Sequence, residues 1–378
     1  MRTTPLRHAL AGLQIVALAA LAASGAAGAQ AAGTLAAGDL AKIDSAITAV
    51  MTRSHIPALS IAIVLDDEVR WQQGYGTADL ENGVAASEST VYRIASTSKA
   101  LTAVAAMQLA ERGALDLDAP IQRYAPGFPR KQFPITTRQL LAHMSGIRHY
   151  KPREPERTEH YEKLSDALAI FANDSLEHEP GARFTYTTFG YTLLGVVIEG
   201  ASGMPYADYM RTHVFEPARM RHTQADDPAV LIPNRAAGYS PRVYGRFDGS
   251  FRNATLLDAS YKLPGGGWLS TAEDLARFAI ALERGVLLEP KTIQQMWAPQ
   301  RARDGRETGY GYGWYLGKRE GARPDRMVWH GGVQPGCTSE LRLVPERHFA
   351  VAILTNLEGG GRLGLGALAS QIANIVLE

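Results

Sequence analysis

Short apolar runs near both ends of the chain constrain its fold more than any other feature. Leu59–Leu65 is almost continuously apolar, and Asp66-Asp67 then turns the chain into a second run, Val69–Gly76. Similar patterns return late in the sequence at Tyr310–Leu316, Arg326–His330, Glu340–Val344 and Phe349–Thr355. Runs of this length between turn residues predict strands. The sequence therefore predicts a sheet built from two distant parts of the chain.

Helical patterns occupy the space between these strands. The apolar spacing of Asp39–Arg53 and Ser98–Arg112 predicts two helices before the middle region. Further helical patterns follow, joined by loops rich in proline and glycine, at 137–143, 163–173, 191–202, 206–214, 272–284, 290–297 and 363–377. Strands at both ends with helices between them indicate an α/β domain with an inserted, mostly helical lobe.

The first residues resemble a secretory signal. Arg2 and Arg7 precede an apolar run over residues 9–23, and small residues then offer cleavage after Ala29 or after Ala31. The run is shorter than the ~20 residues of a membrane-spanning helix, so we expect no stable membrane span after processing. A mitochondrial transit peptide is the other alternative, which the uninterrupted apolar block disfavours. We therefore expect a periplasmic or secreted protein.

Composition narrows the partners and the chemistry. The 39 lysine and arginine residues nearly balance 38 acidic residues without any basic tract, which disfavours nucleic acid as a partner. Cys337 is the single cysteine, so no intramolecular disulfide can form. No metal-binding motif occurs, we interpret His143 and His149 as structural, and Gly265–Gly267 lacks the Lys-Ser/Thr of a phosphate loop. We expect no metal, no cofactor, and a small-molecule or short-peptide substrate; the oligomeric state stays open.

One serine–lysine pair has the spacing of a nucleophile and its base. Ser96 and Lys99 are three residues apart where a helix is expected to begin, so both side chains lie on one helix face. The helix start favours developing negative charge, and a lysine that burial keeps neutral can accept the serine proton. The alternative is a helix-capping serine beside a solvated lysine.

The surrounding motifs favour the catalytic alternative. In chain order, the sequence resembles the superfamily of serine β-lactamases and penicillin-binding proteins, with its D-alanyl-D-alanine carboxypeptidases and esterases, through the stretches Tyr92–Lys99, Gly113–Asp118, Gln139–Ile147, Phe184–Tyr191 and His330–Gly336. The form of Phe184–Tyr191, supported by Asn234–Tyr239, resembles the branch that contains the mitochondrial serine β-lactamase-like protein.

The resemblance implies a fold and a domain plan. The fold would be of the β-lactamase/transpeptidase type, with an antiparallel sheet flanked by helices and an inserted helical lobe. After a signal at residues 1–31, a single catalytic domain would span 32–378. Its sheet would come from about 56–92 and 308–356, and its helical lobe from about 100–300.

The resemblance also implies roles for individual residues. Tyr186 matches a tyrosine that relays protons, and either it or Lys99 would be the principal base. Thr188 stands where the family has an asparagine that holds the lysine and the substrate carbonyl. The N–H groups of Ser96 and Val333 would form the oxyanion hole.

The segment His330-Gly331-Gly332 matches the family's Lys-Thr-Gly or His-x-Gly and would bind substrate at the end of a strand. An unperturbed histidine is mostly neutral at pH 7, so a fixed positive charge is lost there. We therefore expect a serine hydrolase that acts through an acyl-enzyme on an ester or amide, as an esterase or peptidase rather than an antibiotic β-lactamase. A non-catalytic scaffold or binding protein of the same fold is the alternative.

Overall fold

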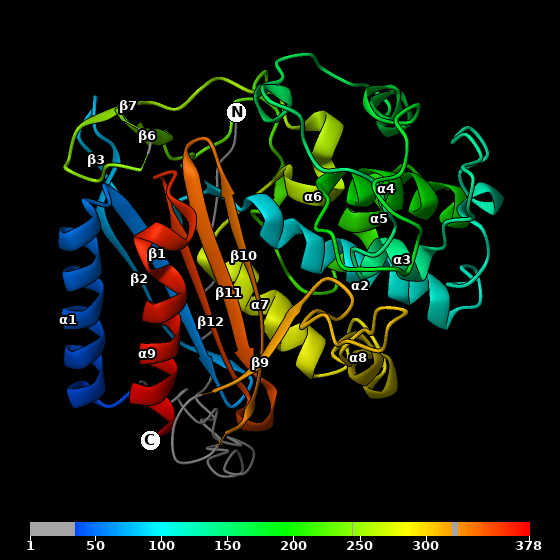
Figure 1. Cartoon of the computed structure of the whole chain (residues 1–378). Helices are drawn as coiled ribbons and strands as arrows, with labels where there is room; N and C mark the ends of the chain where they lie inside the picture. The colour runs from blue at the N-terminus through cyan, green and yellow to red at the C-terminus, as the bar shows by residue number, and fades with distance from the viewer. Residues whose placement is uncertain (1–34, 244, 320–323) are drawn as a thin grey trace, which may run out of the picture. The chain divides into compact units, whose positions relative to one another are not determined.

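The computed structural model describes residues 35–243, 245–319 and 324–378 (Figure 1). The signal predicted over residues 1–31 lies outside these described residues. The described residues make one compact unit. Within the described residues, no helix has both the length and the apolar character needed to cross a membrane.

A seven-stranded sheet, antiparallel at every pairing between its strands, forms the frame of this unit. Its order is β3-β2-β1-β12-β11-β10-β9, so the C-terminal strand β12 lies between β1 and β11. The strands are β1 (Ala58–Leu65), β2 (Glu68–Asp79), β3 (Val84–Ala85), β9 (Tyr315–Lys318), β10 (Arg326–Gln334), β11 (Cys337–Val344) and β12 (Phe349–Thr355). The predicted sheet from two distant parts of the chain is confirmed, and so is the antiparallel fold class.

Both faces of the sheet are buried, which explains the continuous apolar runs. In β1, Leu59, Ile61 and Ile63 belong to one core cluster, whereas Ala62 and Val64 belong to the other. Successive side chains of a strand point to opposite faces, so a strand covered on both sides is apolar at most of its positions.

Helices cover each face of the sheet. Helices α1 (Ala37–Ser54) and α9 (Leu365–Leu377) lie side by side, and α9 packs on β11 and β12 (Figure 1). Helix α7 (Ala272–Glu283) contacts β1, β2 and β12 and contributes to the other core cluster. The core cluster that contains Ala62 and Val64 continues into the helical region, so one core joins the sheet to the lobe.

The helical lobe is inserted between β2 and β9. Its other helices are α2 (Ser98–Glu111), α3 (Thr137–Leu141), α4 (Thr188–Ser202), α5 (Tyr206–Met210), α6 (Leu263–Gly266) and α8 (Pro290–Met296), with 3₁₀ turns at 95–97, 121–123, 154–156, 164–170 and 260–262 and a π-helical turn at 211–215. Two further 3₁₀ turns, at 345–347 and 360–363, lie outside the lobe. Two small sheets join β4 (Tyr92–Arg93), β8 (Trp268–Ser270) and β5 (Gln224–Ala225), and β6 (Tyr239–Pro241) with β7 (Phe251–Asn253).

Several predicted boundaries were wrong. The strand expected from Tyr310 begins only at Tyr315, because Gly313 has a left-handed φ of 81° and lies against α2, where a Cβ would be 2.5 Å from the Cβ of Ala103. The helix expected at 163–173 is a 3₁₀ helix over 164–170.

Two further corrections concern segments of the predicted site. Helix α4 begins at Thr188 rather than Tyr191, because the Thr187 side chain caps it by accepting a hydrogen bond from the N–H of Gly190 at 3.1 Å. Strand β10 does not end at His330 but continues through Gly331 and Gly332 to Gln334.

Candidate active site

Ser96 lies on a short 3₁₀ turn, Ala95–Thr97, directly before α2. Ala95 has a φ of 44°, a left-handed backbone conformation that is unfavourable for alanine. Such strain persists only where surrounding contacts enforce it, and it is common at functional sites. The turn places the Ser96 hydroxyl oxygen 3.1 Å from the Lys99 Nζ, so the sequence spacing does bring the two groups together.

Lys99 is fully buried, and its amine meets only uncharged partners. Its Nζ lies 2.6 Å from the carbonyl oxygen of Gly265 and 3.2 Å from the hydroxyl oxygen of Thr188. No carboxylate of the described residues forms an ion pair with it. Burial, followed by the positive charge of Lys262, holds the pKa of Lys99 well below its ordinary value. The environment therefore favours a neutral amine.

The three contacts of Lys99 match the bonding capacity of that neutral amine. An NH₂ group has two N–H donors and one lone pair. It can donate to Gly265 and Thr188 and accept the Ser96 hydroxyl proton with its lone pair. Thr188 therefore holds the lysine, as the family's asparagine was expected to do, through a shorter side chain.

Tyr186 lies next to this pair. The Lys99 Nζ is 4.9 Å from the centre of the Tyr186 ring. Burial raises the pKa of the Tyr186 phenol well above its ordinary value, and a hydrogen bond with Ser96 acts in the opposite direction on that pKa. The phenol therefore keeps its proton at neutral pH.

His143 and His149 hold the start of α4 through hydrogen bonds to its backbone. The Nδ1 of His143 accepts the N–H of Thr187, and the Nδ1 of His149 accepts the N–H of Thr188, each at 3.1 Å. Burial lowers the pKa of His149 to about 4 and that of His143 well below its ordinary value, and Lys99 adds to this effect only when it carries a proton. Both rings are neutral supports for the backbone that carries Tyr186 and Thr188.

His330 is also neutral. Its Nδ1 lies 2.7 Å from the carbonyl oxygen of Gly331, to which it must donate, and its Nε2 accepts from the Tyr310 hydroxyl at 3.1 Å. Burial lowers the pKa of His330 to about 3, and Lys99 adds to this effect only when it carries a proton. The expected absence of a fixed charge at this position is thus reinforced by burial.

Gly332 allows β10 to approach the serine turn closely. A Cβ on Gly332 would lie 2.4 Å from the carbonyl oxygen of Ile94 and 2.9 Å from the backbone nitrogen of Ser96. The pairing of β9 with β10 ends at Trp329, so no strand of the described chain pairs with that edge of β10 beyond it. A strand edge without a partner strand can pair with an extended peptide.

A cavity of about 460 Å³ lies beside Ser96. The residues predicted for the site all line it, with the exception of Lys99, which lies behind the serine: Ser96, Tyr186, Thr188, His330, Gly331, Gly332 and Val333. The side chain of Val333 is half exposed. A cavity of this size accommodates a small molecule or a few residues of a peptide.

Several residues of the cavity escaped the sequence analysis. Lys262 lines it, and burial, followed by the charge of Arg93, lowers the pKa of Lys262 to about 8, so it is mostly protonated at pH 7. The sequence signal that could have indicated Lys262 was its position three residues before Gly265–Gly267. Glu340 and Glu358 also line the cavity; Glu340 pairs with Arg342 at 2.6 Å, and Glu358 accepts from Ser240 at 2.6 Å.

Comparison with known proteins gives a consistent result. Residues 43–373 match the family model described as Beta-lactamase. The human serine beta-lactamase-like protein LACTB, mitochondrial, is 31% identical, and the match covers 84% of this chain and 76% of that protein.

Solved structures extend the likeness to the fold. The octameric penicillin-binding protein homologue from Pyrococcus abyssi has a TM-score of 0.76 at 26% identity, covering 90% of this chain and 77% of that one. The D-amino acid amidase from Ochrobactrum anthropi SV3 has a TM-score of 0.75 at 25% identity, covering 89% and 99%.

Proposed function

We propose that this chain, which belongs to the beta-lactamase family, is a serine hydrolase in which Ser96 forms the acyl-enzyme. Family membership supports acyl transfer through a serine in general terms. The observation that carries the assignment to Ser96 is its contact with a fully buried lysine that lacks a carboxylate partner among the described residues. A lysine held neutral in this way is an activated base.

The proposed reaction has two steps. Neutral Lys99 accepts the Ser96 proton while the Ser96 oxygen attacks the carbonyl carbon, and the N–H groups of Ser96 and Val333 stabilise the resulting oxyanion. The bond to the leaving group then breaks, and the proton passes from Lys99 to the leaving atom with the Tyr186 phenol as relay. Water attacks the acyl-enzyme in the same way and regenerates the serine. The raised pKa of Tyr186 favours Lys99 as the principal base.

A covalent probe tests the assignment directly. Treatment of the purified chain with a fluorophosphonate is expected to label Ser96, as located by peptide mass spectrometry. Ser96→Ala is the control for the labelled position. A folded wild-type protein that resists the probe, while an active relative reacts, would favour the scaffold alternative instead.

We further propose that neutral esters or amides are preferred over β-lactam antibiotics. His330 and Thr188 support this proposal, since one lacks a charge and the other replaces an amide side chain. A panel of short-chain nitrophenyl esters, a chromogenic cephalosporin, and D- and L-amino-acid peptides separates the alternatives. Faster turnover of the cephalosporin than of the esters would contradict the proposal.

Lys262 favours a second candidate within the same reaction class, a substrate that carries a carboxylate. Lys262 lines the cavity from the 3₁₀ turn before α6, and its ammonium could bind an anionic group there. Peptides with a free carboxylate in the panel above, compared with their amides, test this candidate. A preference for the amide forms would refute it.

We also propose export, on the basis of residues 1–31 alone. The mature chain would begin at Gln30 or Ala32. Sequencing of the N-terminus of protein recovered from the periplasm or medium tests this. An intact Met1 in such protein would contradict cleavage.

A further inference from the structure

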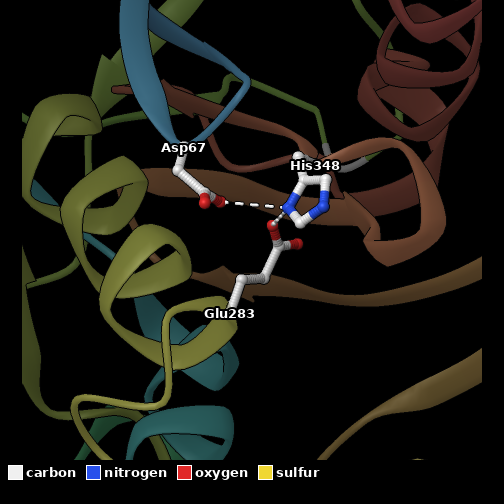
Figure 2. A group of neighbouring side chains, drawn as sticks. All are labelled: Asp67, Glu283 and His348. Atoms are coloured by element: carbon white, nitrogen blue, oxygen red, sulfur yellow. Dashed lines mark hydrogen bonds and ion pairs between the residues drawn. The ribbon is translucent and has the colours of Figure 1, made fainter.

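Three side chains from distant parts of the sequence meet at one end of the large sheet. Asp67 lies in the turn between β1 and β2, Glu283 is the last residue of α7, and His348 follows the turn between β11 and β12 (Figure 2). One atom from each lies within 4.8 Å of the others, namely a carboxylate oxygen, a carboxylate oxygen and an imidazole nitrogen.

The fold dictates this meeting. Leu65 pairs with Phe349 at the ends of neighbouring strands, so the two turns emerge at the same end of the sheet. Helix α7 packs on β1, β2 and β12, which places its C-terminal residue against both turns. None of the three residues lines the cavity of the proposed active site, so the cluster is a separate feature.

Glu283 is the feature that requires an explanation. Its side chain is only 5% exposed, and neither carboxylate oxygen has a hydrogen-bond partner among the described residues. Its nearest cationic candidate, the Nδ1 of His348, is 4.0 Å away, beyond hydrogen-bond distance. Burial and the charges of Asp67 and Glu346 raise the pKa of Glu283 to about 9. A buried carboxyl group without partners is unfavourable unless a bound group satisfies it.

The geometry points to a divalent transition-metal site formed by Asp67, Glu283 and His348. Metal–ligand bonds of about 2.0 to 2.1 Å at tetrahedral angles place neighbouring ligand atoms about 3.3 Å apart. The Nδ1 of His348 lies 3.3 Å from a carboxylate oxygen of Asp67 and 4.0 Å from one of Glu283. A small movement of the exposed His348 ring closes the second distance.

The ligand types select the class of ion. An imidazole with two carboxylates suits Zn²⁺ and similar transition ions, whereas Mg²⁺ and Ca²⁺ prefer oxygen ligands alone. A doubly charged ion also balances the two carboxylates that it would bind. The guanidinium of Arg284, 3.6 Å from the second oxygen of Asp67, opposes a cation but leaves the first oxygen available. We use Zn²⁺ as the probe, with water completing the coordination.

Such an ion would tie two strand turns to the end of α7, so its role would be structural. Binding that is confined to the folded chain stabilises it, and at a Zn²⁺ concentration 100 times the dissociation constant the folding equilibrium constant rises about 100-fold. Esterase turnover is expected to stay unchanged, because the cluster lies outside the cavity.

The test uses the full chain after treatment with a chelator and dialysis. Isothermal titration with Zn²⁺ is expected to give one ion per chain, together with a higher unfolding temperature. Glu283→Gln and His348→Gln should each weaken Zn²⁺ binding at least tenfold, in line with losses seen for residues that merely support metal ligands. Circular dichroism establishes that each variant is folded. Glu283→Gln is expected to fold, because it removes the unpaired buried carboxyl group.

Glu346→Gln is the matched control. Glu346 is a nearby exposed carboxylate that pairs with Arg326 at 3.4 Å and is not among the three ligands. Loss of the Glu346 charge, which contributes to the raised pKa of Glu283, should change Zn²⁺ affinity much less than loss of either ligand does. The proposal would be overturned if the wild type did not bind Zn²⁺ stoichiometrically, or if both ligand variants bound Zn²⁺ as tightly as the wild type.

Discussion

Replacing Gly332 with alanine tests how the proposed oxyanion hole is assembled. The new Cβ would lie 2.4 Å from the Ile94 carbonyl oxygen and 2.5 Å from the Ser339 hydroxyl oxygen, whereas ordinary contacts begin at 3.4 Å. The Ile94 oxygen belongs to the backbone just before the serine turn and cannot rotate away. Strand β10 and the serine turn must therefore separate by about 1 Å, because packed interiors leave no free space to absorb the methyl group.

The magnitude follows from this separation. A displacement of about 1 Å within a catalytic site reduces the rate about 100-fold, and loss of one oxyanion donor reduces it by about the same factor or more. We therefore expect kcat of Gly332→Ala to fall at least 100-fold, equivalent to about 2.7 kcal/mol of transition-state stabilisation. Overpacking is expected to lower the free energy of unfolding by about 1 to 3 kcal/mol.

The neighbouring glycine provides the comparison. A Cβ on Gly331 would meet a Glu340 carboxylate oxygen at 2.9 Å, and its other close contact is at 3.4 Å. The end of a flexible side chain can move aside, so Gly331→Ala should lose much less activity. Steady-state hydrolysis of a nitrophenyl ester and urea unfolding measure both quantities. A Gly332→Ala enzyme within threefold of wild-type kcat would refute the proposed assembly.

Three further outcomes are expected. Thr188→Val should lower kcat/KM about tenfold, since one net hydrogen bond to Lys99 is worth about 1 to 1.5 kcal/mol, and Thr188→Ser should restore it; equal rates for all three proteins would show that the contact is idle. Because the pKa of His330 is lowered to about 3, the unfolded chain binds a proton below pH 6.5 that the folded chain does not, so the free energy of unfolding decreases as pH falls from 6.5 towards 3. At pH 5 the decrease amounts to about 2 kcal/mol. Urea unfolding at pH 7 and pH 5 should therefore show a smaller decrease for His330→Gln than for the wild type. If Lys262 binds substrate carboxylates, the turnover of an anionic ester relative to a neutral one should fall as pH rises through about 8, where Lys262 loses its proton, and this dependence should vanish in Lys262→Met.

Much of the fold could be predicted because apolar periodicity is a local property of the chain. Phe349–Thr355 matches β12 residue for residue, and the helix expected at 272–284 ends one residue early. The errors occurred where a tertiary contact overrides the local pattern. The close approach of Gly313 to α2 shortens the strand expected from Tyr310, and the cap at Thr187 lengthens α4.

The same distinction between local pattern and tertiary contact applies to the candidate site. The Ser96–Lys99 contact could be predicted because three residues make about one helical turn whatever surrounds it. The ordered motifs added Tyr186 and His330 through resemblance. Neither source indicated that Gly265 would supply a carbonyl oxygen to the lysine or that Lys262 would line the cavity, because these residues meet the serine only through packing.

The ionisation of the site shows the difference most clearly. Residue types alone give Lys99 a positive charge and leave His330 near its titration midpoint. Burial and the charge of Lys262 lower the pKa of Lys99, and burial is the main cause of the lowered pKa of His330; only the packed lobe and sheet provide these surroundings. The same holds for Asp67, Glu283 and His348, which have no motif in the sequence and converge because two strand turns and a helix end share one edge of the core. Local spacing thus determined the proposed pair of Ser96 and Lys99, whereas long-range packing determined the charge state of Lys99 and the convergence of Asp67, Glu283 and His348.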